Sequence, residues 1–249
     1  MSKHHITKVV SIQEINKDIF RIRLQLETFP KIVPGQFLNV KVTGFSLRRP
    51  FAICDWDEKK KTVDFGFILR GEGTIALSKV KVGDTLDVLL PLGNGFADTY
   101  TTNSKVMLVG GGVGVFPLLS VAKNHPNCYS LLGYRNNDTI CLVDEFKQHS
   151  KEVITNIGGF ITDDVKREIG RIKPDVVLCC GPDALMKALG KSLREGTNVP
   201  IYVSLEQRMA CGFGACLCCN QQVKVKDEIE NLRVCCEGPV FKLEDVVWH

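Results

Sequence analysis

Six of the eleven cysteines lie in one short stretch near the end of the chain, between Cys211 and Cys236. Three of them have the spacing Cys211-x4-Cys216-x2-Cys219, and Cys235 follows sixteen residues later. This is the plant-type arrangement of thiolates around a [2Fe–2S] cluster. Two glycines inside the stretch permit the tight turns that would bring four thiolates together. We therefore predict that Cys211, Cys216, Cys219 and Cys235 bind the two irons.

Two further cysteines lie directly beside predicted ligands, so the identity of two of the four ligands is not fixed by the sequence. Cys218 precedes Cys219, where the x2 spacing favours Cys219, and Cys236 follows Cys235, where the spacing decides less. A structural zinc site is the main alternative, although zinc ligands usually come as well-separated CxxC-type pairs. Disulfides are not expected, because the chain starts without the apolar segment of a signal peptide and is long enough to fold without cross-links.

Bulk composition excludes several classes of protein. The 249 residues are enough for one large or two ordinary domains, and 44% hydrophobic with 24% charged residues is usual for a globular protein. A net charge of +4 is too small to indicate binding to nucleic acid or to a membrane surface. No apolar run is long enough to span a bilayer. Eleven cysteines and no recognisable export signal predict that the protein is located in the reducing cytoplasm.

The first hundred residues predict a small antiparallel barrel. Residues 6–12, 19–26 and 36–42 alternate between apolar and polar with period two, and 62–69 and 85–90 read as further strands. Another strand is expected to start near residue 48, and a short helix at 74–78. About six strands without a long helix are typical of such a barrel.

After residue 103 the pattern changes to alternating strands and helices. Strands are expected at residues 105–109, 128–133, 153–155, 176–180 and 201–204, and helices at 115–122 and 183–195. This order predicts a parallel sheet with crossover helices. The chain is thus expected to hold three domains: an antiparallel barrel at 1–101, a Rossmann-like α/β domain at 102–205 and a cysteine-rich, cluster-binding domain at 206–249.

Four segments outside the cysteine stretch have residues suited to nucleotide binding. Arg48 and Arg49 begin a barrel strand, and residues 71–74 (Gly-Glu-Gly-Thr) form a turn that could bind a phosphate. Residues 110–114 (Gly-Gly-Gly-Val-Gly) join a strand to a helix, and Cys180 ends a later strand before Gly-Pro, at the edge where parallel sheets receive ligands. Each also has a plain interpretation as a solvated face, an ordinary turn or a core thiol.

The order of these segments resembles the ferredoxin–NADP⁺ reductase superfamily. Residues 49–52 (Arg-Pro-Phe-Ala) come first, then the Gly-Glu-Gly-Thr turn, the glycine loop and Cys-Gly-Pro at 180–182. The segments 206–216 (Glu-Gln-Arg-Met-Ala-Cys-Gly-Phe-Gly-Ala-Cys), 235–241 and 92–96 (Leu-Gly-Asn-Gly-Phe) are similar to the electron-transfer subunits of type B dihydroorotate dehydrogenase. This likeness extends over nearly the whole chain.

The resemblance implies three cofactors: FAD, a [2Fe–2S] cluster and NAD. The residues implied for FAD are Arg49, Pro50, Phe51, Ala52, Gly66, Phe67, Ile68, Gly73 and Thr74. Those implied for the nicotinamide side are Gly110, Gly111, Gly112, Gly114, Cys180, Gly181 and Pro182. Ala52 stands where the superfamily often has Ser or Thr, and Phe51 where it often has Tyr. The missing hydroxyl is expected to affect flavin potential and hydride transfer more than binding.

The implied function is that of an oxidoreductase subunit in pyrimidine biosynthesis. Electrons would pass from an FMN-bearing catalytic subunit through the cluster and FAD to NAD⁺, in a heterotetramer with two chains of each kind. The chain offers no acid–base pair for dihydroorotate oxidation. Apolar residues of the tail (Phe213, Leu217 and Phe241) would suit a docking surface or a core.

Two alternatives stay open on the sequence. One is a related NAD(P)H reductase subunit serving a hydrogenase, sulfur reductase or glutamate synthase-like partner. The other is a zinc-stabilised binding module without electron transfer. Residues 135–138 (Arg-Asn-Asn-Asp), which follow the second strand of the α/β region, do not decide between NAD and NADP.

Overall fold

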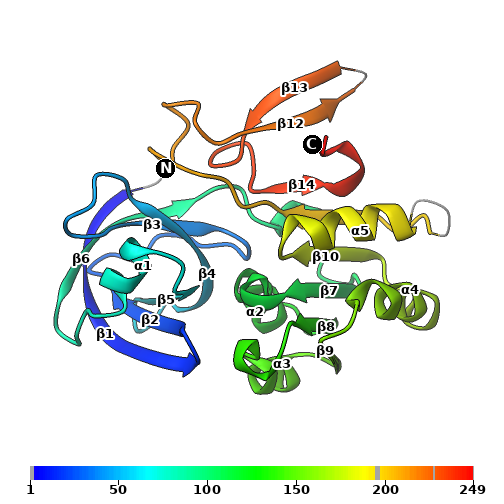
Figure 1. Ribbon diagram of the computed structural model, residues 1–249, viewed down its shortest axis with the longest axis horizontal. Coiled ribbons are helices and arrows are strands. Elements are labelled where there is room, and N and C mark those ends of the chain that lie inside the picture. The colour runs from blue at the N-terminus through cyan, green and yellow to red at the C-terminus, as the bar shows by residue number, and fades with distance from the viewer. Residues whose placement is uncertain (1–2, 194–196, 227, 249) are drawn as a thin grey trace.

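The computed structural model describes residues 3–193, 197–226 and 228–248. They form a closed six-stranded barrel, a six-stranded sheet flanked by helices, and a two-stranded hairpin (Figure 1). The barrel and the sheet stand side by side, and the hairpin lies above their junction in this view. The expected fold class is confirmed. None of the helices in the described ranges is long and apolar enough to cross a membrane.

The barrel has the strand order β1-β2-β5-β4-β3-β6, and all its pairs are antiparallel. Its elements are β1 (Lys3–Asn16), β2 (Ile19–Gln25), β3 (Phe37–Lys41), β4 (Arg49–Asp57), β5 (Thr62–Ile68), α1 (Glu72–Leu77) and β6 (Thr85–Leu92). Alternation explains the core: along β6, Leu86, Val88 and Leu90 point inward, while Asp87 and Leu89 between them are partly exposed. β1 is longer than predicted, because it pairs with β6 through one half and with β2 through the other.

The second sheet has the order β14-β11-β10-β7-β8-β9. Its strands are β7 (Val106–Gly111), β8 (Cys128–Tyr134), β9 (Glu152–Ile157), β10 (Val176–Cys180), β11 (Ile201–Ser204) and β14 (Val240–Lys242). The first five are parallel, as predicted. β14 is an antiparallel edge strand contributed by the cysteine-rich tail, which the sequence analysis did not predict.

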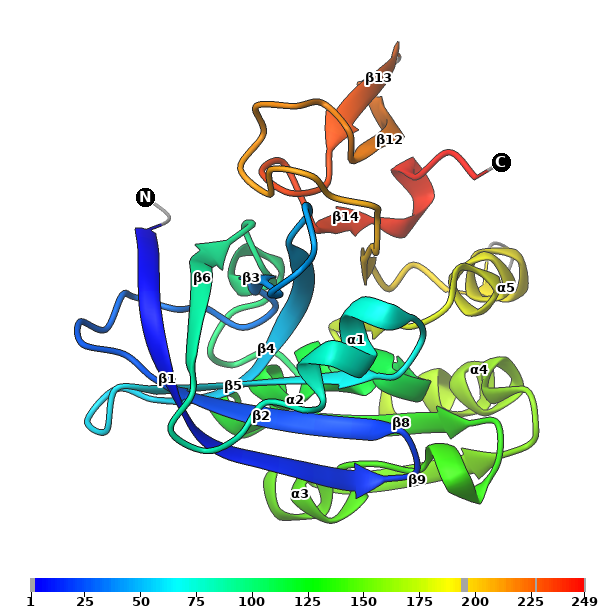
Figure 2. The ribbon, with the colours of Figure 1, turned by 60° about the vertical axis from the view of Figure 1, so that its left-hand side comes forward.

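Helices cover both faces of this sheet (Figure 2). They are α2 (Val115–Asn124), α3 (Val143–His149), α4 (Ile161–Ile172) and α5 (Asp183–Leu193), and residues 194 and 195 of the helix predicted at 183–195 lie outside the described residues. Alternate side chains of β7 point to opposite faces of the sheet. Leu108 packs in the core under α2 and α3, whereas Met107 and Val109 belong to the core under α4 and α5.

The tail is attached to both larger units. Beyond the hairpin of β12 (Asn220–Val225) and β13 (Glu228–Arg233), the Gly238 carbonyl accepts a 2.8 Å hydrogen bond from the N–H of Asn94 in the barrel. The Pro239 carbonyl accepts one of 2.9 Å from the N–H of Leu205 after β11. Gly93, at φ 74°, leaves the room this contact needs, since a Cβ there would stand 2.5 Å from the Pro239 ring. The two motifs at 92–96 and 235–241 are therefore in direct contact and attach the tail to the barrel.

A network of ion pairs connects the barrel with the α/β unit. Arg21 of β2 binds Asp64 of β5 at 2.8 Å and Glu145 of α3 at 2.7 Å. Lys123 of α2 binds Asp55 of β4 at 2.6 Å and Glu145 at 3.0 Å. The side chains of Arg21 and Lys123 are only 13% and 17% exposed, so the network is shielded from solvent screening.

We expect Lys123→Met to lower the free energy of unfolding by about 2 kcal/mol, between the values for exposed and fully buried pairs. The loss arises because Arg21 then remains the one cationic partner of both Asp55 and Glu145 within the described residues, while it also pairs with Asp64. Lys60→Met is the matched control, because its partner Asp57 lies 3.5 Å away and the Lys60 side chain is 79% exposed. Urea unfolding of both variants measures the difference. Equal effects at both positions would contradict a shielded network.

Candidate functional site

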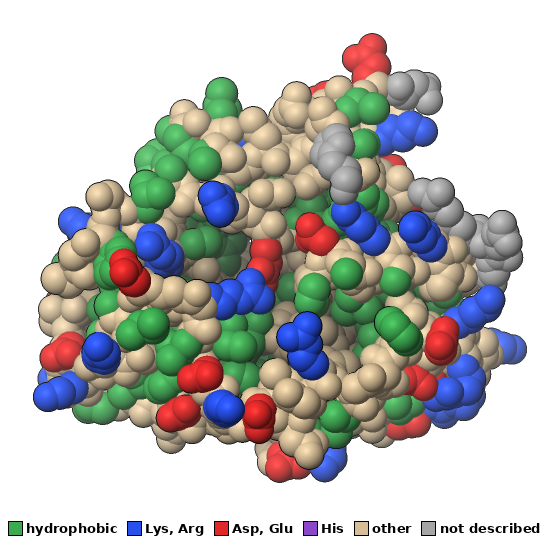
Figure 3. Space-filling model, in the orientation of Figure 1, with side chains coloured by type: hydrophobic (Ala, Val, Ile, Leu, Met, Phe, Trp, Pro, Cys, Tyr) green, Lys and Arg blue, Asp and Glu red, His purple; other side chains and the backbone are tan. Residues whose placement is uncertain are grey.

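A cavity of about 260 Å³ opens where the barrel, the α/β unit and the segment after β11 meet. Figure 3 shows the surface hollowed between the two larger units, with apolar side chains at its bottom and charged ones at its rim. The lining residues are Gly35, Phe37, Pro50, Phe51, Ala52, Gly66, Phe67, Ile68, Arg70, Thr74, Val113, Phe116, Pro117, Cys180, Ser204, Leu205, Glu206, Gln207, Met209 and Pro239. The cavity thus brings together most of the barrel residues predicted for FAD, and Cys180 from the nicotinamide side.

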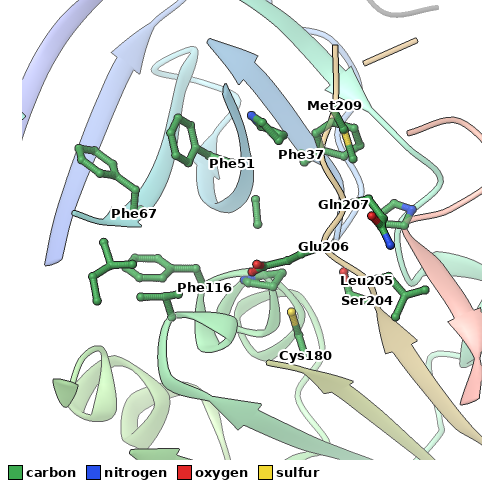
Figure 4. A pocket seen from close by; sticks show the side chains of 18 of the residues that line it. Phe37, Phe51, Phe67, Phe116, Cys180, Ser204, Leu205, Glu206, Gln207 and Met209 are labelled. Carbon is green, nitrogen blue, oxygen red and sulfur yellow. The ribbon is translucent and has the colours of Figure 1, made fainter. Parts of the chain in front are cut away.

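Aromatic rings make the barrel side of this cavity flat and apolar. The ring centroids of Phe51 and Phe67 are 5.4 Å apart, and Phe65 lies behind them, 5.2 Å from Phe51. In Figure 4 Phe116, which comes from α2, lies below Phe51 and Phe67, whose rings point toward the barrel. Such a slot fits a planar, largely apolar ring system that has one polar edge. The residues present are therefore compatible with the isoalloxazine of FAD.

The two neighbouring arginines differ in what they bind. Arg48 is structural, since its guanidinium donates to the Asp87 carboxylate at 2.8 Å and to the Asp87 carbonyl at 3.0 Å. Arg49 lies over the Phe45 ring and donates to the Leu47 carbonyl at 2.7 Å. Its guanidinium faces α1, where a Cβ on Gly73 would stand 2.8 Å from Arg49 Nε. Arg49 is thus the member of the pair placed to bind a phosphate next to Gly73.

The hydroxyl of Thr74 is already used within its own turn. Thr74 Oγ1 accepts from the N–H of Arg70 at 2.9 Å and of Gly71 at 3.2 Å, and it donates to the Gly71 carbonyl at 2.9 Å. These bonds shape the turn that begins α1. A direct bond from Thr74 to a phosphate stays a prediction.

The glycine loop and the Cys-Gly-Pro turn touch each other through their backbones. A Cβ on Gly114 would stand 2.4 Å from the Cys180 carbonyl oxygen, and one on Gly111 would stand 3.1 Å from the Pro182 ring. The register explains the meeting, since Gly110 and Cys180 are paired in adjacent parallel strands. Any larger residue would force the two segments apart at the edge where such sheets receive nucleotides.

Several cavity residues had no predicted role. Glu206 lies two residues after the end of β11 and points into the cavity in Figure 4, near Cys180. Burial raises the pKa of Glu206, while Arg70 opposes this rise. Burial likewise raises the pKa of Cys180 well above its ordinary value, and Glu206 adds to the effect. The cavity therefore holds a protonated thiol beside a carboxyl group. The sequence signals for Glu206 were its place after a strand of the parallel sheet and its membership of the 206–216 motif, neither of which assigned it a role.

The four cysteines predicted as cluster ligands form two pairs. The Cys216 thiol hydrogen-bonds to the Cys211 sulfur. The Cys235 thiol hydrogen-bonds to the Cys219 sulfur, which also accepts the N–H of Cys235 at 3.4 Å. No three metal-ligating side chains converge on one point within residues 3–193, 197–226 and 228–248. Two pairs fit a [2Fe–2S] cluster, because each of its two irons takes two protein ligands.

The backbone of the cysteine loop favours thiolates. Burial opposes ionisation of Cys211, but hydrogen bonds from the N–H groups of Phe213, Cys216 and Ala215 outweigh it and lower the pKa of Cys211 to about 6. The Gly214 N–H points to Cys235, whose pKa burial raises. All eleven cysteines of the chain are free. The loop is thus built to present N–H donors to sulfur, as a bound iron–sulfur cluster requires.

The surplus thiols have different surroundings. Cys218 is exposed, whereas Cys219 is 2% exposed and paired with Cys235. Cys236 is turned toward Gly214, where a Cβ would stand 2.7 Å from its sulfur. These positions favour Cys219 over Cys218, whereas Cys235 and Cys236 both adjoin Gly214 of the cysteine loop, so the choice of Cys235 stays a prediction.

Comparisons with known proteins agree with this geometry. Residues 206–247 match the family model of the iron–sulfur cluster binding domain of dihydroorotate dehydrogenase B. The chain is 34% identical over 98% of its length to the electron transfer subunit of dihydroorotate dehydrogenase B (NAD(+)) of Streptococcus mutans, covering 98% of that protein. It is 36% identical over 99% of its length to the Geobacillus sp. subunit of the same name, covering all of it.

A solved structure is similar over the whole fold. The NADH-dependent reduced ferredoxin–NADP oxidoreductase, described for flavin-based electron bifurcation, superposes with a TM-score of 0.82 at 30% identity, over 98% of this chain and 90% of the other. Fold and site thus define a flavin-reductase-like electron carrier with an added iron–sulfur domain. The chain belongs to the family of electron transfer subunits of dihydroorotate dehydrogenase B (NAD(+)). The resemblance and the electron-transfer function expected from the sequence are confirmed.

We expect Gly66→Ala to close the flavin slot. A Cβ on Gly66 would stand 1.9 Å from the Phe116 ring, which is 1% exposed and has no room to move. FAD content per chain should fall, and the free energy of unfolding should drop by about 1–3 kcal/mol. Gly170→Ala in α4 is the control, because its Cβ would meet nothing within 4 Å. Unchanged FAD content and stability in Gly66→Ala would contradict this packing.

Serine variants test the ligand set one thiol at a time. Cys219→Ser and Cys235→Ser should lose iron and acid-labile sulfide, since each removes a member of a buried pair. Cys218→Ser and Cys236→Ser, their sequence neighbours, should keep wild-type content. Colorimetric assays on anaerobically purified protein measure both elements. Loss of iron in Cys218→Ser with retention in Cys219→Ser would reverse the assignment.

Proposed function

We propose that this chain carries electrons between an FMN-bearing dihydroorotate dehydrogenase subunit and NAD⁺ in pyrimidine biosynthesis. The observation that carries the proposal is the position of β3. Phe37 of this strand lines the flavin-sized cavity and belongs to the same apolar core as Cys219 and Cys235. One continuous apolar core thus connects the cavity with two of the predicted cluster ligands.

Each cofactor is assigned to residues of this chain. FAD is held by Arg49, Pro50, Phe51, Ala52, Gly66, Phe67, Ile68, Gly73 and Thr74. NAD is held by Gly110, Gly111, Gly112, Gly114, Cys180, Gly181 and Pro182, and the cluster by Cys211, Cys216, Cys219 and Cys235. When bound, FAD exchanges a hydride with NAD and single electrons with the cluster, so it converts one kind of transfer into the other.

The protein positions these groups and excludes water. Phe51, Phe67 and Phe116 enclose the ring system, and Arg49 binds its phosphate end. Cys180 and Glu206 present a protonated thiol and a carboxyl group at the nicotinamide side. Neither group is needed as a proton donor for hydride transfer, so we assign them the orientation of the nicotinamide.

The docking surface for the catalytic subunit lies on the cysteine loop. Phe213 and Leu217 are 56% and 59% exposed on this loop, whereas Phe241 is buried and belongs to the core. Exposed apolar residues beside a redox centre suit an interface across which electrons pass. We further propose that two copies of this chain and two catalytic subunits form a heterotetramer. We propose the cytoplasm as its location, because eleven free cysteines suit a reducing compartment.

Reconstitution tests the proposal. Mixed with the FMN-bearing subunit, the wild-type chain should support NAD⁺ reduction by dihydroorotate, measured at 340 nm. Cys219→Ser should abolish this reaction while NADH still bleaches the flavin band of the variant, because only the cluster step is lost. Cys218→Ser should keep both reactions. NAD⁺ reduction by Cys219→Ser at the wild-type rate would contradict a route through the cluster.

A further inference from the structure

Asn39 of β3 is a fully buried amide without a hydrogen-bond partner. Its side chain is 0% exposed, and neither Oδ1 nor Nδ2 has a partner within the described ranges. Buried amides are nearly always hydrogen-bonded, because losing water without replacement is costly. Exchanging the amide oxygen and nitrogen changes nothing here, since both atoms are unpartnered. The position therefore indicates a partner that the polypeptide itself does not supply.

Alternation along β3 directs Asn39 toward the cysteine loop. Leu38 and Val40 point into the barrel core, so Phe37 and Asn39 point outward. A Cβ on Gly212 would stand 2.5 Å from Asn39 Nδ2, which places the amide directly beneath the residue that follows Cys211. On the neighbouring strand β4, Asn39 is paired with Pro50, which lines the cavity. Asn39 thus lies between the two predicted cofactor sites.

We propose that the Asn39 amide donates a hydrogen bond to a sulfur atom of the cluster held by the Cys211 loop. Sulfide and thiolate sulfurs are the acceptors that a bound cluster would bring to this buried place. The inference rests on the proposed function, since it requires the cluster. A donor at sulfur stabilises the reduced cluster, which carries one more negative charge, and so raises its midpoint potential. Asn39 is a positioning residue that adjusts the potential of the cluster next to FAD.

The test replaces the amide by a side chain of similar size. Asn39→Leu removes donor and acceptor, and Asn39→Asp keeps the shape but loses the NH₂ donor. Both should shift the cluster midpoint potential to more negative values in an EPR-monitored titration, and both should reduce the H₂O-to-D₂O shift of the Fe–S Raman bands. Asn127→Leu is the control, because Asn127 Oδ1 is also buried and unpartnered but lies at the start of β8. Its potential should equal that of the wild type.

Wild-type potential and Raman shift in Asn39→Leu would overturn the inference. If Asn39→Leu fails to assemble a cluster, pulsed EPR of the unaltered protein decides. Asparagine labelled with ¹⁵N in the side chain should give a nitrogen coupling to the reduced cluster, and its absence would overturn the inference equally. A wild-type protein without iron would instead contradict the proposed function, so the two failures are distinguishable.

Discussion

The contact between the outward face of β3 and the cysteine loop is the constraint on which the arrangement depends. A barrel strand has two faces, and here one builds the barrel core while the other carries Phe37 and Asn39 to the tail. Phe37 shares an apolar core with Leu205 after β11 and with Cys235 of the tail. Since burial of that core is the main force joining the segments, the barrel, the sheet and the cysteine loop are held in one geometry.

The arrangement also requires that three glycines lie in close contact with residues of other segments. Gly66 admits the Phe116 ring to the barrel wall, and Gly114 admits the backbone of Cys180 to the glycine loop. At Gly212 the loop turns with φ 80° directly over Asn39. Each position joins two units that are distant in sequence. These three approaches fix the positions of the barrel, the glycine loop and the cysteine loop relative to one another, and Gly66 also lines the cavity.

The pattern of apolar and polar residues predicted most strands and helices. The features that it did not predict depend on contacts between segments that are distant in sequence. The continuous apolar run of residues 176–180 predicted the bounds of β10, because a strand that is buried on both faces has no polar alternation. The antiparallel partner of β11 was not predicted, since pairing between Val203 and Phe241 is a property of the folded tail. Cysteine spacing provided four candidate cluster ligands, whereas Glu206, Phe116 and Asn39 have no spacing signal. Their places follow only from which segments meet.

An anaerobic titration of the isolated wild-type chain with NADH, followed by visible absorbance with iron and acid-labile sulfide assayed on the same sample, tests the central claim most directly. The account predicts flavin bands superposed on a broad cluster absorption, two irons and two sulfides per chain, as a [2Fe–2S] cluster requires, and loss of both absorptions on reduction. Zinc in place of iron, or a flavin that NADH reduces while the cluster absorption stays unchanged, would contradict it.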